Sequence, residues 1–191
     1  MSELGTIYRI EDELNTTGTF DVNHRQIIAQ VEVAGAAAAT IDFQNIPSYY
    51  KNLRIIYSLR GDTALAVVPV YMRWNADASA NYCYQRILGQ NVTVTPSNAV
   101  GQTSMLIAAG TGATAGAGMW GCGDINIPVY SINQIHGCFA LNMASYGTTA
   151  ATQFINYYGG WLNVAMSINR ITLTPSAGNF IIGSRVYLLG E

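Results

Sequence analysis

Residues 51–60, KNLRIIYSLR, decide the fold of this protein. Apolar and polar residues alternate along this stretch, which is the pattern of a β-strand with one buried face. The apolar set is Leu53, Ile55, Tyr57 and Leu59. Fully burying these side chains yields roughly 6–12 kcal/mol, whereas ordering the backbone of the stretch costs about 10–20 kcal/mol. The strand therefore needs partner strands on both edges and a second layer over its apolar face.

The remainder of the chain predicts further short strands separated by turns. Gly, Pro, Asn and Asp cluster between runs of alternating or β-branched residues, as in all-β proteins. The strands expected on this basis cover residues 27–33, 36–39, 40–43, 64–74, 81–88, 103–108, 124–130, 137–143, 152–158, 163–174 and 180–189. Pro69 lies inside one of them and indicates a sheet edge or a β-bulge. About ten strands without an amphipathic helix or a fixed repeat predict an antiparallel sandwich or barrel.

Several connecting segments carry more specific expectations. Residues 175–179, PSAGN, predict a hairpin turn between the last two strands. Residues 108–118, AAGTGATAGAG, are of low complexity and predict a mobile connection. Helical turns are expected at residues 49–51 and 146–149 only.

Residues 1–26 differ from everything that follows. They hold a dense share of the charged residues and show little apolar alternation. We interpret them as an extended N-terminal arm before a single domain over residues 27–191, which is long enough to bury a real core. A neighbouring subunit could order such an arm, or it could be frayed as termini often are.

The charge composition favours self-association and argues against two classes of partner. Charged residues make up 10% of the chain, against about 25% in an average soluble domain. Because few surface charges are present to keep copies of the protein apart, association or assembly is favoured. The net charge is −2 and Lys51 is the only lysine, so there is no basic stripe for nucleic acid. No apolar run approaches the ~18–20 residues of a membrane span.

Targeting and redox signals are equally sparse. The acidic start, MSELGTIYRIEDE, does not match a signal peptide. Cys83, Cys122 and Cys138 are odd in number and widely spaced, which argues against a disulfide framework. We therefore expect three reduced thiols in a protein made in a cytosol.

Motifs for catalysis or cofactor binding are weak. Residues 116–121 match G-x-G-x-x-G, but a β-like segment with Pro128 follows instead of a helix. No acidic residue lies near the position about 20 residues on where a dinucleotide site requires one. His136 with Cys138 and Cys122 falls short of the four ligands of a structural zinc site. We interpret His136 and Cys138 as strand residues and expect no cofactor and no metal.

The carboxylates give a similar result. Asp42, Asp62, Asp77 and Asp124 are the acidic residues that could converge on a site. We interpret each as a strand-end or turn residue that satisfies local backbone groups. Calcium at Asp62 or Asp77 stays open as an alternative. With two histidines and no G-x-S-x-G elbow, the sequence predicts a protein that is not an enzyme.

The aromatic residues form the remaining signal. They fall into two groups, which are Trp74, Tyr82 and Tyr84, and Tyr157, Tyr158 and Trp161. Buried rings of this kind fill a sandwich core, and at a subunit interface they act as anchors. Exposed rings beside Asn and Gln could instead stack on a glycan. The core or interface interpretation is favoured, and the glycan alternative stays open.

Several short segments, taken in order, resemble a broad family of bacteriophage virion proteins with a jelly-roll or related β-sandwich fold. The segments are TIDF (40–43), NIP (45–47), YKNL (50–53), Arg60, VYMRWN (70–75), NY (81–82), ITL (171–173), GNF (178–180), GS (183–184) and YLLG (187–190). The resemblance runs from about residue 36 to the C-terminus and leaves out the arm and the Gly-rich stretch. It implies a single jelly-roll-like antiparallel β-sandwich.

Members of that family occur as head-decoration (cement) proteins, head fibres, and tail or tail-fibre modules, commonly as homotrimers. The resemblance therefore implies a virion protein that is assembled in the host cytoplasm. We expect capsid decoration, with copies that self-associate on the major capsid protein and residues 1–26 as anchor. The alternative from the same resemblance is a tail-fibre receptor-binding module that recognises a host surface glycan.

Overall fold

The computed structural model describes residues 25–145 and 152–191, which form strands and connecting loops without a helix. The strands are β1 (Gln26–Glu32), β2 (Ile41–Phe43), β3 (Asn52–Leu59), β4 (Val67–Trp74), β5 (Tyr82–Gln90), β6 (Thr93–Gln102), β7 (Met105–Thr111), β8 (Gly121–Pro128), β9 (His136–Ser145), β10 (Thr152–Trp161), β11 (Ile171–Pro175) and β12 (Arg185–Gly190). Apart from its last two residues, the expected arm lies outside the described residues, as does the turn expected at 146–149. No helix long and apolar enough to cross a membrane occurs among the described residues.

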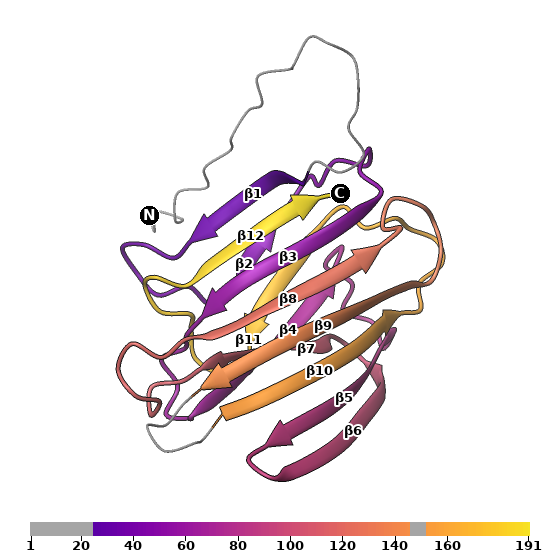
Figure 1. The fold of residues 1–191 in the computed structure, drawn as a ribbon. Coiled ribbons are helices and arrows are strands. Elements are labelled where there is room, and N and C mark those ends of the chain that lie inside the picture. Colours follow the sequence, from indigo (N-terminus) through magenta and orange to yellow (C-terminus); the bar gives the residue numbers. More distant parts are fainter. Residues whose placement is uncertain (1–24, 146–151) are drawn as a thin grey trace.

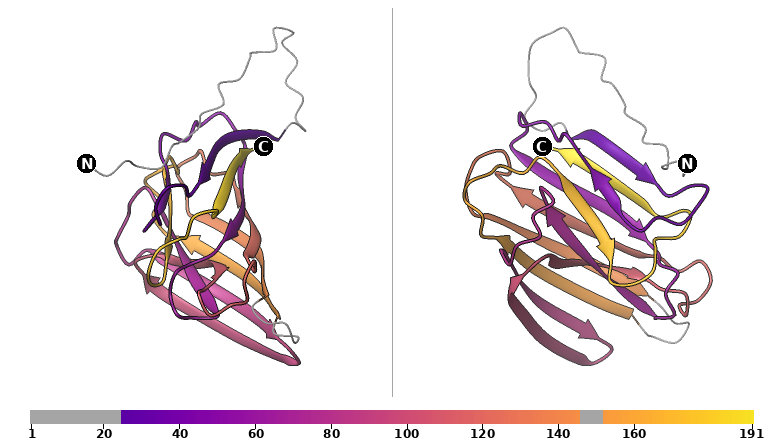
Figure 2. Two further views of the ribbon diagram at one scale, coloured as in Figure 1. Left: turned by 90° about the vertical axis from the view of Figure 1, so that its left-hand side faces the viewer. Right: turned by 180° about the vertical axis from the view of Figure 1, so that it is seen from behind.

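The strands form two antiparallel sheets that pack face to face (Figure 1). The larger sheet has eight strands in the order β1-β12-β3-β8-β9-β10-β5-β6, and the smaller has four in the order β2-β11-β4-β7. The turned views in Figure 2 show the two layers. The all-β sandwich predicted from the sequence is therefore confirmed.

The connectivity within this sandwich is that of a jelly roll. Strands β1, β12, β3 and β8 are successive neighbours in the larger sheet, and strands β2, β11, β4 and β7 make up the smaller one. Every link between these eight strands crosses from one sheet to the other, except the link from β4 to its neighbour β7. This is the double-sheet arrangement of a jelly roll. Two hairpins, β5–β6 and β9–β10, are inserted into it and extend the larger sheet on one side.

Strand β3 lies inside the larger sheet, as its alternation requires. It pairs with β12 on one edge and with β8 on the other. Its four apolar side chains are buried against the smaller sheet, and Ile55 has no exposed surface. Ile56, the next residue, points to the outer face and is 38% exposed. Both partner edges and the covering layer inferred from residues 51–60 are therefore present.

A buried polar network joins the two sheets. The Tyr57 hydroxyl donates a hydrogen bond to Asn142 Oδ1 on β9 and accepts one from the amide of Ala109 on β7, at 3.2 Å. The Asn142 amide also donates to the carbonyl of Ile107 on β7, at 3.2 Å. Strand β7 is an edge strand, so these contacts satisfy backbone groups that no strand pairs. A Cβ on Gly123 would come within 2.4 Å of both polar side chains, and only glycine leaves room for them.

The prediction of a hairpin turn at residues 175–179 is wrong. Strand β11 belongs to the smaller sheet, between β2 and β4, whereas β12 lies in the larger sheet between β1 and β3. The turn therefore crosses between layers. The Asp62 carboxylate holds it there by accepting hydrogen bonds from the backbone and side-chain amides of Asn179, at 2.7 and 3.0 Å. Turn residues alone do not say in which sheet the next strand pairs.

Other boundaries also differ from expectation. Residues 163–170 form a loop, residues 36–39 contribute one isolated bridge, and residues 49–51 form no helical turn. Strand β6 was not expected, because its sequence TVTPSNAVGQ lacks apolar alternation; it forms by pairing with β5. Pro69 lies in β4, which is an interior strand, and a bulge follows it between Val70 and Tyr71.

The prediction of a mobile connection at residues 108–118 is wrong for residues 108–111. Residues 108–111 belong to the buried end of β7. The loop that follows is held by Arg60, whose guanidinium donates hydrogen bonds to the carbonyls of Ala115, Gly116 and Met119 at 2.9–3.1 Å. Small residues pack closely here, so a low-complexity composition does not imply mobility.

We predict a large difference between two adjacent substitutions in β3. Ile55→Ala should lower the free energy of unfolding by about 2–5 kcal/mol, because it leaves a cavity between the sheets. Ile56→Ala is the matched control and should cost at most about 1 kcal/mol, because this side chain lies on the outer face. Urea unfolding measures both values. Equal losses would contradict the assignment of the two faces.

Candidate functional site

Four of the six aromatic residues singled out from the sequence belong to the core. Trp74, Tyr82, Tyr157 and Trp161 are at most 1% exposed. A glycan or a neighbouring subunit cannot reach these rings in the folded protein, so the surface-site interpretation is wrong for them. Tyr84 is half-buried on the inner face of β5. Tyr158 alone is well exposed, at 59%, on the outer face of β10.

Trp161 is the centre of a buried aromatic cluster. Its ring stacks against Tyr82 and His136, with centroids 6.4 and 5.9 Å apart, and meets Trp74 edge-on at 6.0 Å. The indole Nε1 donates to Asp77 Oδ2 at 2.7 Å. Burial raises the pKa of Tyr82 to about 12, with a partly compensating hydrogen bond at Trp74. This cluster packs the sandwich and offers no surface to a ligand.

Asp77 organises the turn beside this cluster. Its carboxylate accepts hydrogen bonds from the Ser79 amide at 2.8 Å and the Asn81 side chain at 2.9 Å, in addition to that from Trp161. Burial acts to raise the pKa of Asp77, but these donors outweigh it and hold the pKa well below the ordinary value. N–H donors thus occupy both carboxylate oxygens, which gives Asp77 a structural role in this turn.

Each of the other candidate carboxylates interacts with a separate set of partners. Asp42 accepts from Arg170 and Thr172 at 2.7–3.2 Å, and Asp124 pairs with Arg54. Both aspartates lie within strands, so the expectation that they occupy turns or strand ends is wrong. They form ion pairs across neighbouring strands, β2 with the start of β11 and β8 with β3. Asp62 serves the turn at Asn179, as described above.

The histidine and cysteines form no metal site in the described part of the chain. His136 is fully buried, and its Nε2 lies 3.2 Å from the Met166 carbonyl. Cys138 is buried against Met105, and burial raises the pKa of its thiol. Cys122 lies on the opposite face of the larger sheet, beside Met143.

The G-x-G-x-x-G match at residues 116–121 has no nucleotide-site geometry. The segment leads into strand β8 rather than a helix. Its carbonyls are turned toward Arg60, as described above, so the loop presents acceptors to a cation rather than amides to a phosphate. The Thr111 hydroxyl donates to the Met119 carbonyl at 2.7 Å and closes the same loop.

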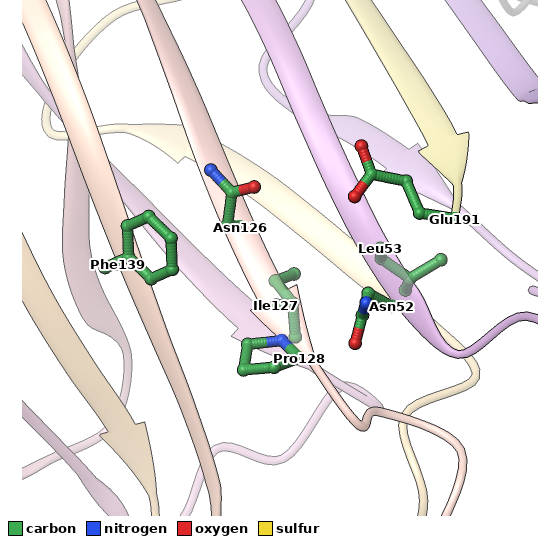
Figure 3. Close-up of a pocket in the computed structure, with 7 residues that line it drawn as sticks. All are labelled: Asn52, Leu53, Asn126, Ile127, Pro128, Phe139 and Glu191. Atoms are coloured by element: carbon green, nitrogen blue, oxygen red, sulfur yellow. The ribbon is translucent and has the colours of Figure 1, made fainter. Parts of the chain in front are cut away.

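A shallow hollow of about 180 Å³ lies at one end of the larger sheet (Figure 3). It runs over the ends of β8 and β3 beside the C-terminus, with Phe139, Asn126 and Glu191 on its walls. Small-molecule sites usually enclose about 300–1,000 Å³. The hollow is therefore smaller than a typical small-molecule binding site.

The most unusual surface of the described protein is the outer face of the two inserted hairpins. Apolar side chains alternate outward along β9 and β10, and their cross-strand partners continue the pattern: Met143 faces Phe154, and Phe139 faces Tyr158. We call this surface the outer apolar face. It consists of Ile87, Val94, Phe139, Leu141, Met143, Phe154 and Tyr158, each 44–68% exposed.

This surface has the layout of a contact region. None of its seven side chains is charged, and the described residues beside it on β8 are Cys122, Asp124 and Asn126, of which the last two are polar. An apolar centre with a polar rim is the common anatomy of a protein interface. Sequence analysis expected the strands but not the exposure. The available signal was that both alternating faces of residues 137–141 lack polar side chains.

Comparisons with known proteins assign no family to this chain. No protein-family model and no curated protein matches the chain. Solved structures with a weak likeness include the CBM40 of the Ruminococcus gnavus IT-sialidase bound to α2,6-sialyllactose and to α2,3-sialyllactose. The identities are 9% and 10%, the TM-scores are 0.30 and 0.28, and each match covers 86% of this chain and 90% of the other. A likeness this weak carries no argument about a ligand.

We predict that His136 makes the protein less stable in mild acid. Burial lowers the pKa of His136 below its ordinary value of 6.5, so the unfolded chain takes up a proton before the folded protein does. The free energy of unfolding should therefore fall as the pH drops from 7 through 6.5. His136→Phe keeps a ring beside Trp161 and removes the proton site, so its stability should stay flat over this range.

Urea unfolding at a series of pH values measures this effect. His24→Gln is the control, because it also removes one histidine but keeps His136. This control should show the wild-type pH dependence. A flat wild-type profile between pH 7 and 5.5 would contradict the prediction.

Proposed function

We propose that this protein is a non-enzymatic structural protein of a bacteriophage particle, and that it decorates the capsid by self-association and by binding the head shell. The observation that carries the proposal is the outer apolar face on an otherwise complete jelly roll. A monomeric surface rarely exposes a contiguous apolar patch larger than a few hundred Å² unless the patch binds something. Such a surface favours an assembly component.

The fold is compatible with this role but does not assign it. Double-sheet jelly rolls occur in viral capsid proteins and in lectins, and a fold alone does not determine function. The segments of residues 36–190 that resemble phage virion proteins favour the first of these. The low share of charged residues, 10%, also fits a surface that is largely covered in an assembly.

The non-enzymatic part of the proposal follows from how the candidate groups are used. Asp42 and Asp124 pair with arginines, while Asp62 and Asp77 hold turns. His136 lies in the aromatic cluster, away from solvent. A general acid or nucleophile needs a reactive atom within reach of a substrate. None of these groups combines exposure with a catalytic partner.

The copy number of the protein in purified particles tests the proposal. Quantitative mass spectrometry against the major shell protein should give a ratio near one, or a fixed simple fraction of it. An abundant host protein measured in the same preparation controls for contamination. A handful of copies per particle would instead place the protein in the tail or a fibre, and absence from particles would overturn the proposal.

Glycan recognition is tested separately on the folded protein. Tyr158 is the one aromatic residue of the six predicted from the sequence that a sugar ring could reach freely. A capsid decoration protein should give no specific hits on a glycan array. Binding that is lost in Tyr158→Ser and kept in a control variant, Tyr49→Ser, would favour a receptor-binding module over decoration.

Removal of residues 1–24 tests the proposed anchor. The shortened chain keeps all of β1, which begins at Gln26. We predict that it no longer sediments with particles lacking the protein, whereas the full chain does. If the shortened chain binds as well as the full chain, the arm is not the anchor.

A further inference from the structure

We infer that the outer apolar face is covered by a second copy of this chain. The inference rests on the self-association in the proposed function and gives that association a surface. The face lies on β5, β6, β9 and β10, the hairpins inserted into the jelly roll. The hairpins therefore add an area that the sandwich itself does not cover.

The size of the face suits a stable contact. Large apolar side chains offer roughly 150–250 Å² each when fully exposed, so seven of them at about half exposure present on the order of 600–700 Å². A standard interface buries about 800 Å² per partner. The seven side chains alone therefore account for most of that area. Crystal-type contacts without biological role are about half this size or less.

The absence of charge on the face selects among the possible occupants. The first 24 residues of the chain hold six charged side chains, and the described side chains of the face offer them no counter-charge. A second copy brings the same apolar surface, and two sheets stack well face to face at about 10 Å. An uncharged surface is thus better complemented by the same surface of a second copy than by the charged arm.

Pairing of the larger sheet through its β6 edge is less suitable than contact through its face. Its β6 edge carries Pro96 near the middle of the strand. Proline lacks the amide donor that a new strand would need, and natural proteins use it to protect such edges. No comparable protection exists on the described outer face, where Leu141 is 52% exposed between strands that are already paired.

Leu141→Lys tests the inference on the purified full-length protein. Asp124 is the cross-strand partner of Leu141, so the new ammonium group has an opposite charge beside it and the subunit should fold. At the contact, the same charge would be buried against an apolar surface. We expect sedimentation equilibrium to show an oligomer for the wild type and a dissociation constant at least tenfold higher for the variant.

Ile182→Lys is the matched control, because Ile182 is 56% exposed but lies in the loop before β12. It should associate like the wild type. Because the contact is apolar, raising the salt concentration from 0.1 to 1 M should not dissociate the wild type. Circular dichroism and thermal unfolding check the fold of each variant. If Leu141→Lys does not fold, Tyr158→Glu on the adjacent strand tests the same face.

Three results would overturn the inference. The first is a wild-type protein that stays monomeric at 100 µM, a concentration about a hundredfold above a micromolar dissociation constant. The second is an oligomer that a folded Leu141→Lys variant leaves unchanged. The third is a monomer that begins to associate only when residues 1–24 are removed, because the arm would then cover the face.

The outcome is independent of the particle experiment. Association of the purified protein concerns only this chain, whereas the copy number concerns its presence on a virion. An oligomer that is absent from particles would support the surface and refute capsid decoration. A monomer present at a fixed ratio on particles would refute the surface and leave decoration in place.

Discussion

The sandwich depends on burying one face of strand β3 against the smaller sheet without leaving the polar groups of that sheet unpaired. Tyr57 answers both needs, because its ring lies in the core and its hydroxyl reaches the free edge of β7. Asn142 completes the contact from β9. Unpaired buried backbone groups cost about 1–3 kcal/mol each, so this bridge fixes the position of the smaller sheet on the larger one.

The two inserted hairpins explain why this jelly roll has an unusual surface. Strands β9 and β10 need apolar residues on their inner face, where they complete the core around Trp161 and Tyr157. They carry apolar residues on the outer face as well, where the described chain provides no cover. A strand that is apolar on both faces is typical of burial on both sides. This pattern is the basis for our inference that a second copy of the chain covers the outer face.

The polar residues show the opposite behaviour, since their partners lie within the subunit. Arg60 holds the loop before β8, Asp77 holds the turn before β5, and the Asp42–Arg170 pair joins β2 to the start of β11. Asp42 and Asp77 were possible site residues when only their type and spacing were known. Hydrogen bonds to neighbours distant in the sequence give each of them a structural role. The few charged side chains of the described chain are thus used to hold loops and strands together.

The sequence by itself determined the fold class, the buried face of β3 and most strand positions, because alternation with a period of two is a local property. It did not determine the sheet to which each strand belongs, so residues 175–179 looked like a hairpin turn although they cross between layers. It also missed β6, whose polar sequence is ordered only by its partner β5. Exposure was decided by the tertiary structure alone: Tyr157 and Tyr158 are adjacent and chemically identical, but the sandwich buries one and leaves the other on the outer face.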